Sequence, residues 1–191
     1  MKLKAIDITL AAMFAALMAV GSNITSFIII GGVPITLTTF LCVMAGLILG
    51  SRLGALSMTV YTLIGLVGAP VFANFTGGPS VLVKPTFGFV LSYILVAYVV
   101  GKIVEKKSSK KMFLFAALIG LVINYFVGTN WMYYAYKFWA SAPEGFTYKM
   151  AWAWMVAPLP KDIIFTIIAG VMAPRIQKVV SKSYIGKRSV A

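Results

Sequence analysis

The sequence predicts an all-α integral membrane protein, a bundle of six transmembrane helices with a long outer loop between the third and fourth. Of its 191 residues, 61% are hydrophobic and 11% are charged, and the mean hydropathy is +0.96. Soluble domains contain only about 45–50% apolar residues. About 17 to 25 apolar residues cross a bilayer as a helix. The apolar windows predict one transmembrane domain over residues 1–191, with spans at about 6–30, 35–50, 53–71, 86–105, 111–137 and 160–180.

The basic residues predict how these spans are oriented. With the N-terminus inside, thirteen Lys and Arg residues fall on the inner side and four on the outer side. The inner set is Lys2, Lys4, Arg52, Lys102, Lys106, Lys107, Lys110, Lys111, Arg175, Lys178, Lys182, Lys187 and Arg188, and the outer set is Lys84, Lys137, Lys149 and Lys161. Because Lys and Arg concentrate in cytoplasmic loops, we expect a multi-pass protein of the cell membrane with both termini cytoplasmic. Anionic lipid is then a sufficient partner for the net charge of +13, and the charge does not indicate binding of nucleic acid.

The first span carries a ridge of small residues. Ala11, Ala15 and Ala19 recur every four residues, and Ala12 and Ala16 form the adjacent ridge. Small residues at this interval let two helices approach closely in lipid. The ridge of Ala11 therefore either packs against another helix of the same chain or forms a docking face for a separate membrane subunit.

The loop from Pro70 to Gly88, PVFANFTGGPSVLVKPTFG, is polar and lies between two apolar runs. Irregular backbone cannot face lipid, so we expect this loop to cover a ligand site. The fifth span adds Asn124 and Asn130, whose amides need a partner in the backbone, another helix or a ligand. The aromatic residues near its outer end are equally typical of an interfacial belt.

The last span begins with an acid. Pro158 and Pro160 end any helix that arrives there and suit a new first turn, so a helix is predicted to begin at about Pro160. Asp162 then lies in its first turn, which favours a carboxylate. An acid in an apolar outer segment is a functional candidate, and the alternative is a helix cap or an ion pair with a neighbouring lysine. Lys161 is expected to point about 100° away from Asp162 and to address a different part of any ligand.

Several motifs together resemble one family. They are PITLTTF, AGLILGSRLGALS and GLVGAPVFANFTGGPSVLVKPTFGF between Val33 and Gly88, followed by YFVGTNW and APLPKD. Over essentially the whole chain, they are similar to the BioY family, the biotin-specific substrate-binding subunits of energy-coupling-factor (ECF) transporters. The chain departs from the family where members often read GPTGG, at Lys84 to Gly88, and where they often have a lysine, at Phe165.

The resemblance implies high-affinity capture and uptake of biotin, which is bound as the transported substrate and not as a cofactor. Since the sequence contains no G-x-x-x-x-G-K-[ST] phosphate loop, ATP is hydrolysed by other chains. The implied partners are a membrane scaffold subunit and two ATPase subunits, with the ridge of Ala11, Ala15 and Ala19 as the docking surface. Ala15→Trp is then expected to leave biotin binding intact and to abolish uptake.

Biotin gives the candidate residues their roles, because it carries two ureido N–H groups, a polarised carbonyl, an apolar thioether ring and a carboxylate tail. Asp162 fits the acceptor of the N–H groups. Asn130, Asn124 or Asn74 fits the donor to the carbonyl, and Lys84 or Lys161 fits the partner of the tail. The candidate walls are Phe72, Tyr125, Trp131, Trp152 and Trp154.

Two other readings stay open. The same architecture would serve a subunit for another vitamin, such as thiamin or riboflavin. An intramembrane enzyme is disfavoured, because the chain has no histidine and a single apolar cysteine, Cys42, which leaves no metal site and no nucleophile–base pair. Such an enzyme would need Glu144 beside Asp162 as a carboxylate pair.

Overall fold

The fold is seen in a computed structural model that describes residues 4–30 and 33–186; the predicted inner residues Lys2, Lys187 and Arg188 lie outside this part. The all-helical prediction is confirmed. The helices are α1 (Ala5–Asn23), α2 (Thr38–Leu66), α3 (Phe87–Lys106), α4 (Lys110–Phe138), α5 (Tyr148–Val156) and α6 (Leu159–Gly186). A short antiparallel pair, β1 (Ile29–Ile30) and β2 (Val33–Pro34), precedes α2, and two 3₁₀ turns, η1 (Ala73–Phe75) and η2 (Pro79–Val83), lie in the long loop.

Helix α2 contains a chain reversal at Gly50, which separates the second and third predicted spans. Gly50 has φ +83° and ψ 179°, a conformation that favours glycine. A Cβ built on Gly54 would lie 3.1 Å from Cα of Gly46, whereas eight residues of straight helix extend about 12 Å. The segments on either side of Gly50 therefore fold back on each other as a helical hairpin.

Side chains from two other helices stabilise this reversal. Glu105 of α3 accepts hydrogen bonds from the backbone N–H of Ser51 at 2.7 Å and from its hydroxyl at 2.9 Å. The carboxylate thus caps the helical segment that starts after Gly50. Gln177 of α6 donates to the carbonyl of Leu47 at 3.2 Å, near the end of the preceding segment. The polar backbone groups exposed by the break are in this way partnered inside the bundle.

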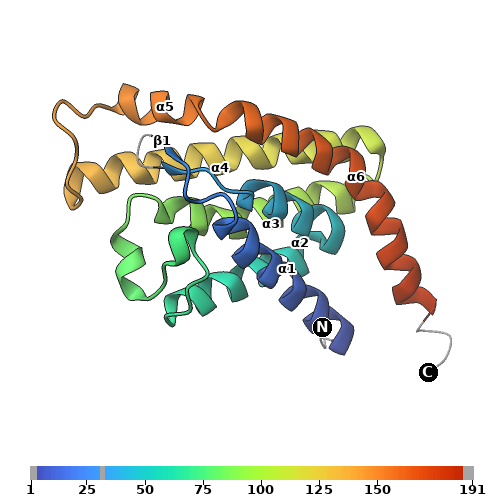
Figure 1. The fold of residues 1–191 in the computed structure, drawn as a ribbon. Helices are drawn as coiled ribbons and strands as arrows, with labels where there is room; N and C mark the ends of the chain where they lie inside the picture. The colour runs from blue at the N-terminus through green and yellow to red at the C-terminus, as the bar shows by residue number, and fades with distance from the viewer. Residues whose placement is uncertain (1–3, 31–32, 187–191) are drawn as a thin grey trace.

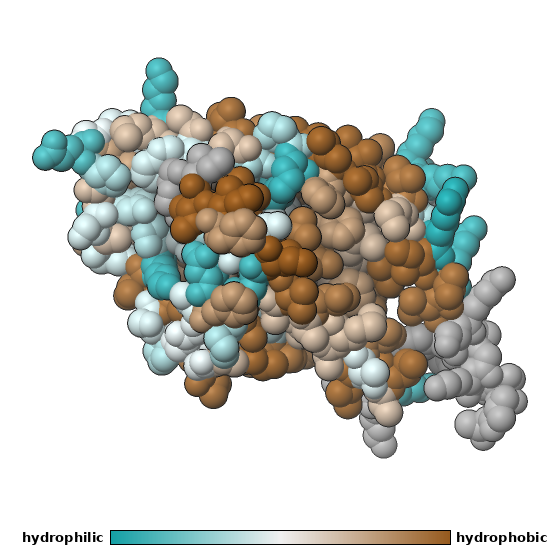
Figure 2. Space-filling view, viewed as in Figure 1, coloured by the Kyte–Doolittle hydropathy of each residue, from teal (hydrophilic) through white to brown (hydrophobic). Residues whose placement is uncertain are grey.

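The helices pack in the order α1, α2, α3, α4 and α6, and α6 returns to contact α2. One end of the bundle holds the start of α1, the α3–α4 turn and the end of α6 (Figure 1). The opposite end holds the long loop, the β1–β2 pair and the α4–α5 connection (Figure 1). Within the described residues, all of these helices except α5 are long and apolar enough to cross a membrane. Figure 2 shows hydrophobic residues over the middle of the molecule and hydrophilic ones toward both ends.

Two of the three alanines predicted as a docking surface are buried inside the chain, and the third, Ala19, is half-buried. Ala11 and Ala15 are 3% and 5% exposed, and Ser57 donates a hydrogen bond to the carbonyl of Ala11 at 2.7 Å. The ridge therefore serves the alternative role of close packing against α2. A tryptophan at position 15 would enter the core, so Ala15→Trp does not test docking. The adjacent ridge of Ala12 and Ala16 is exposed instead.

Candidate ligand-binding site

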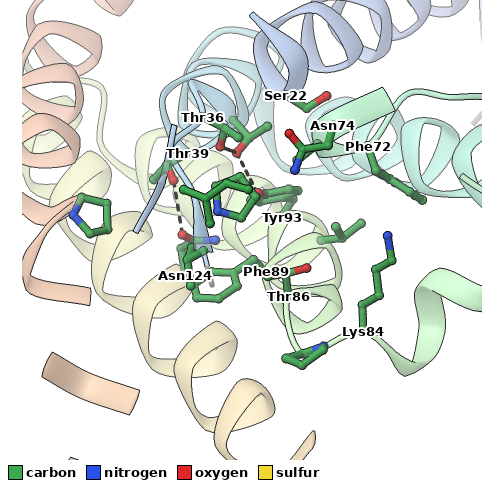
Figure 3. A pocket seen from close by; sticks show the side chains of 18 of the residues that line it. Ser22, Thr36, Thr39, Phe72, Asn74, Lys84, Thr86, Phe89, Tyr93 and Asn124 are labelled. Carbon is green, nitrogen blue, oxygen red and sulfur yellow. Dashed lines mark hydrogen bonds between the residues drawn. The ribbon is translucent and has the colours of Figure 1, made fainter. Parts of the chain in front are cut away.

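A cavity of about 270 Å³ opens at the end of the bundle that carries the long loop. This volume is close to the lower limit of about 300 Å³ for small-molecule sites. Its lining comes from the β1–β2 pair, the start of α2, the long loop, and residues of α3, α4 and α6. Apolar walls such as Phe72 and Phe89 alternate with polar groups such as Thr36, Tyr93 and Asn124 (Figure 3). The predicted covering loop thus forms one side of a cavity.

The two halves of the loop are held by different helices. The first half is tied to α1 and α2, where the carbonyl of Val71 accepts hydrogen bonds from Ser22 and Tyr61. The second half is tied to α4, because the indole N–H groups of Trp131 and Trp139 donate to the carbonyls of Lys84 and Val83 at 3.3 and 2.7 Å. The loop is therefore an anchored wall of the site.

One end of the cavity carries a charged cluster in which Asp162 is buried and Lys161 is half-buried. Lys161 Nζ lies 2.8 Å from Oδ1 of Asp162 and also donates to the carbonyl of Thr36. The hydroxyl of Tyr125 donates to Oδ2 of Asp162 at 2.8 Å. Helix α6 begins at Leu159, one residue before the predicted start, and places Asp162 in the first turn as expected. The expected divergence of Lys161 from Asp162 is wrong, because the long lysine side chain curls back onto the carboxylate.

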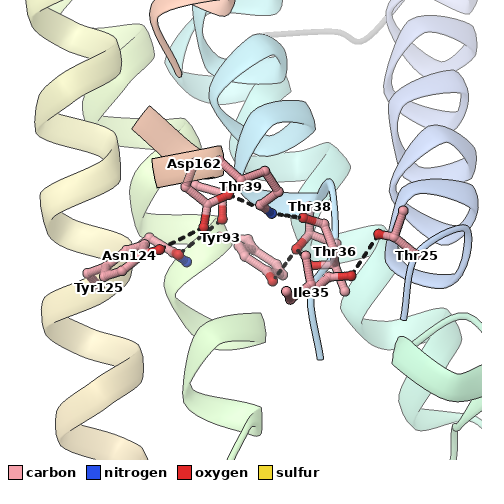
Figure 4. A network of polar contacts seen from close by, with 10 residues as sticks. Thr25, Ile35, Thr36, Thr38, Thr39, Tyr93, Asn124, Tyr125 and Asp162 are labelled. Atoms are coloured by element: carbon pink, nitrogen blue, oxygen red, sulfur yellow. Dashed lines mark hydrogen bonds and ion pairs between the residues drawn. The ribbon is translucent and has the colours of Figure 1, made fainter. Parts of the chain in front are cut away.

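A network of neutral groups continues from this cluster (Figure 4). Asn124 accepts a hydrogen bond from Thr39 at 3.3 Å. It also donates one to Ser92 at 2.7 Å. The hydroxyls of Thr38 and Tyr93 are 2.7 Å apart in the same region. A primary amide has two N–H donors and a carboxylate about four acceptor positions. Asn124 and Asp162 therefore retain hydrogen-bonding capacity for a ligand.

The opposite side of the cavity is marked by Lys84, which lies well apart from Asn124 in Figure 3. The charged residues of the described lining are Lys84, Lys161 and Asp162. Two cations and one anion give the lining a net charge of +1. The site is thus two-ended, with an ion-paired acceptor cluster at one end and a separate cation at the other.

The structure brings together seven of the sequence-predicted ligand residues. Asp162, Lys161, Lys84, Asn124, Asn74, Phe72 and Tyr125 all line the cavity. Asn130, Trp131 and Trp152 lie outside this lining. Asn130 donates to the carbonyl of Phe126 and accepts from Tyr148, Trp131 holds the loop at Lys84, and Trp152 packs on Tyr148.

Trp154 and Glu144 are also outside the lining. Trp154 packs against Tyr136 and Phe146, and Glu144 is exposed in the α4–α5 connection. The carboxylate pair required by an enzyme is therefore not part of the described cavity.

Sequence reasoning missed several lining residues. Thr36, Thr38 and Thr39 were recognisable as a hydroxyl-rich run directly before an apolar helix. Tyr93 had no such signal, because it is one aromatic residue in an apolar span and only its rotation about α3 turns it to the cavity.

The fold belongs to a known class of membrane proteins. It matches a solved structure, described as the S-component for biotin from an ECF-type ABC transporter, with a TM-score of 0.79 and 21% identity over 93% of this chain and 95% of the other. The chain is 43% identical to the BioYB protein of Bacillus subtilis, over 95% of this chain and 92% of that protein. It is 36% identical to biotin transporter BioY of Thermotoga maritima, over 88% of this chain and 94% of that protein.

The model of the BioY family matches residues 1–182. Since this match covers nearly the whole sequence and the relatives align along most of their length, the chain belongs to the BioY family.

Proposed function

We propose that the protein captures biotin in this cavity and serves as the substrate-binding S-component of an ECF-type ABC importer. Membership of the BioY family places the chain among transport proteins and not among enzymes. Its relatives from Thermotoga maritima and Rhodobacter capsulatus are named biotin transporter BioY. The cavity adds support from chemistry, because its polar groups match both ends of biotin.

The observation that carries this proposal is the two-ended distribution of charge. Asp162 offers acceptor positions for the ureido N–H groups, and the second amide N–H of Asn124 is a donor for the ureido carbonyl. Lys84 is the cation for the carboxylate tail, since Lys161 is already engaged with Asp162. The net lining charge of +1 complements a monoanion and disfavours a cation such as thiamin.

The experiment is equilibrium binding by purified protein in detergent, with thiamin and riboflavin as the comparison ligands. We expect biotin to bind with a Kd at least about 100-fold lower than either, a difference of about 2.7 kcal/mol. Tight binding of thiamin or riboflavin, with none of biotin, would move the protein to the second reading.

We further propose that the partners are a transmembrane scaffold subunit and two ATPase subunits, that the termini are cytoplasmic, and that residues 1–191 act as one transmembrane domain. Basic residues of α3, α4 and α6 gather at the end of the bundle where α1 begins, which supports this orientation. The docking face is the exposed side of α1 at Ala12 and Ala16, because small residues on a lipid-facing ridge allow close helix contact.

A tryptophan at the docking face tests this partner assignment. Ala16→Trp is expected to leave biotin binding unchanged and to abolish uptake in cells that express the complete transporter, because the indole separates the helices. Val122→Trp is the matched control and should transport normally, because Val122 of α4 is 63% exposed. Normal uptake by Ala16→Trp would remove this face from the interface.

A further inference from the structure

Residues at the end of α1 and just after it form hydrogen bonds with the part of the long loop that lines the cavity. The carbonyl of Val71 accepts hydrogen bonds from the Ser22 hydroxyl at 2.5 Å and from the Asn23 amide at 3.4 Å. In the other direction, the Asn23 oxygen accepts from the N–H of Phe75 at 2.7 Å, and Ser26 accepts from the N–H of Asn74 at 3.1 Å. The segment from Val71 to Thr76, here called the clamped turn, is thus held at both of its arms.

The clamped turn has a conformation that needs outside support. Phe72 and Thr76 exchange backbone hydrogen bonds of 3.0 and 3.2 Å, which close the turn. Between them, Asn74 and Phe75 have φ of +59° and +53°. Positive φ is tolerated by asparagine and is unfavourable for a bulky residue such as phenylalanine. Such a conformation persists only where the surroundings determine it.

The same turn supplies two walls of the proposed biotin site. Phe72 and Asn74 line the cavity, and both lie beside Ser22 of α1 in Figure 3. The Phe72 ring is 3% exposed and meets the ring of Tyr61 edge-on, with 5.4 Å between the centroids. Asn74 is exposed, so hydrogen bonds to its backbone matter more to its placement than packing does.

Asn23 is the residue that spans the turn. Its amide nitrogen donates to the carbonyl of Ala19 at 2.9 Å within α1 and also reaches Val71, while its oxygen holds Phe75. Asn23 itself is not part of the cavity lining. Its side chain therefore acts on the site only through the clamped turn.

We propose that Asn23 is a positioning residue for ligand retention, which locks the clamped turn over the bound ligand and so sets the rate at which the ligand leaves. This inference rests on the proposed function, because it takes biotin as the ligand. Loss of the lock frees Phe72 and Asn74 to move away from an occupied cavity. The dissociation rate then rises more than the association rate, because the contacts of Phe72 and Asn74 with the ligand exist only in the complex and are weakened there.

The test compares Asn23→Ala with wild type and with Thr9→Ala. Thr9 lies on the same helix, is exposed, and donates one hydrogen bond to the carbonyl of Ala5. Thr9→Ala therefore removes a side-chain bond to the helix backbone, as Asn23→Ala does, but leaves the contacts with the loop in place. Dissociation of radiolabelled biotin is followed after addition of excess unlabelled biotin. Amide hydrogen exchange over residues 70–78 is measured in ligand-free protein, and thermal unfolding serves as the check of folding.

For Asn23→Ala we expect dissociation to be about tenfold faster, equivalent to about 1.4 kcal/mol, with association changed by less than about threefold. Exchange over residues 70–78 should accelerate, while Thr9→Ala matches wild type in both measurements. Asn23→Asp keeps the acceptor for Phe75 and loses the donor to Val71, so it should give an intermediate dissociation rate and provides a second variant if Asn23→Ala does not fold.

Dissociation and loop exchange equal to those of Thr9→Ala would overturn the role of Asn23. If folded wild-type protein does not bind biotin, the proposed function fails. The exchange measurement still decides whether Asn23 locks the turn, because it uses no ligand.

Discussion

Removal of the negative charge at Asp162 should separate its role in binding from its role in stability. Asp162→Asn keeps one oxygen that can accept from Tyr125 and replaces the other, which lies 2.8 Å from Lys161, with an NH₂ group. Lys161 then loses its ion-pair partner in a place where its side chain is 24% exposed. The Thr36 carbonyl remains as a partner for the ammonium.

The size of both effects follows from these contacts. Loss of one partner of a buried ion pair costs about 3–5 kcal/mol, and partial exposure with the remaining Thr36 bond lowers the expected loss of unfolding free energy to about 1–3 kcal/mol. In the complex, the variant weakens hydrogen bonds from the ureido N–H groups to a carboxylate, each of which contributes about 1.5–3 kcal/mol. With one neutral acceptor retained, we expect a loss of about 2–4 kcal/mol, or about 30- to 1,000-fold in Kd.

Titration calorimetry and thermal unfolding of the purified variants test these numbers. Lys161→Met combined with Asp162→Asn removes both charges, so the double variant should recover most of the lost stability. It should not recover affinity, because the carboxylate acceptor is still missing. A Kd for Asp162→Asn within about threefold of wild type would refute the assignment of Asp162 to the ureido group, whatever the change in stability.

Three further predictions concern the tail end of the cavity, its amide donor and the reversal in α2. Lys84→Gln should weaken biotin about tenfold or more and change the affinity for biotin methyl ester by less than about twofold; equal losses for both ligands would contradict the pairing of Lys84 with the tail. Asn124→Ala should lower biotin affinity at least about tenfold, whereas Asn130→Ala should stay within about twofold, and the reverse order in calorimetry would contradict the assigned lining. Gly50→Ala should lower the unfolding free energy by about 1–3 kcal/mol, because φ is +83° and the new Cβ would lie 2.7 Å from Glu105; an unchanged denaturation midpoint would argue against a strained reversal.

Local sequence signals predicted where the helices lie along the chain and where they begin. The apolar runs gave the helical fold, and the prolines at 158 and 160 predicted the start of α6 to within one residue. That start places Asp162 in the first turn of α6, which is why its position at the cavity could be predicted. Arg52 likewise lies at the turn between the second and third predicted spans, where a charged residue interrupts the apolar sequence.

Which face of each helix is buried or lines the cavity could not be predicted from the sequence. Ala11 and Ala12 are neighbours in sequence, yet one is buried against α2 and the other is exposed. Trp131 donates a hydrogen bond to the Lys84 carbonyl of the long loop, whereas Tyr125 of the same helix donates one to Asp162 in the cavity. In an apolar span both faces carry similar residues, so no hydrophobic periodicity distinguishes the cavity side from the lipid side. Tertiary packing alone decides it.

Biotin is the proposed ligand, and calorimetric titration of the purified wild-type protein with biotin tests this most directly. We predict saturable binding of one biotin per chain, with thiamin and riboflavin giving no heat at the same concentrations. No heat with biotin, from protein that unfolds cooperatively and binds one of the other vitamins, would contradict the account.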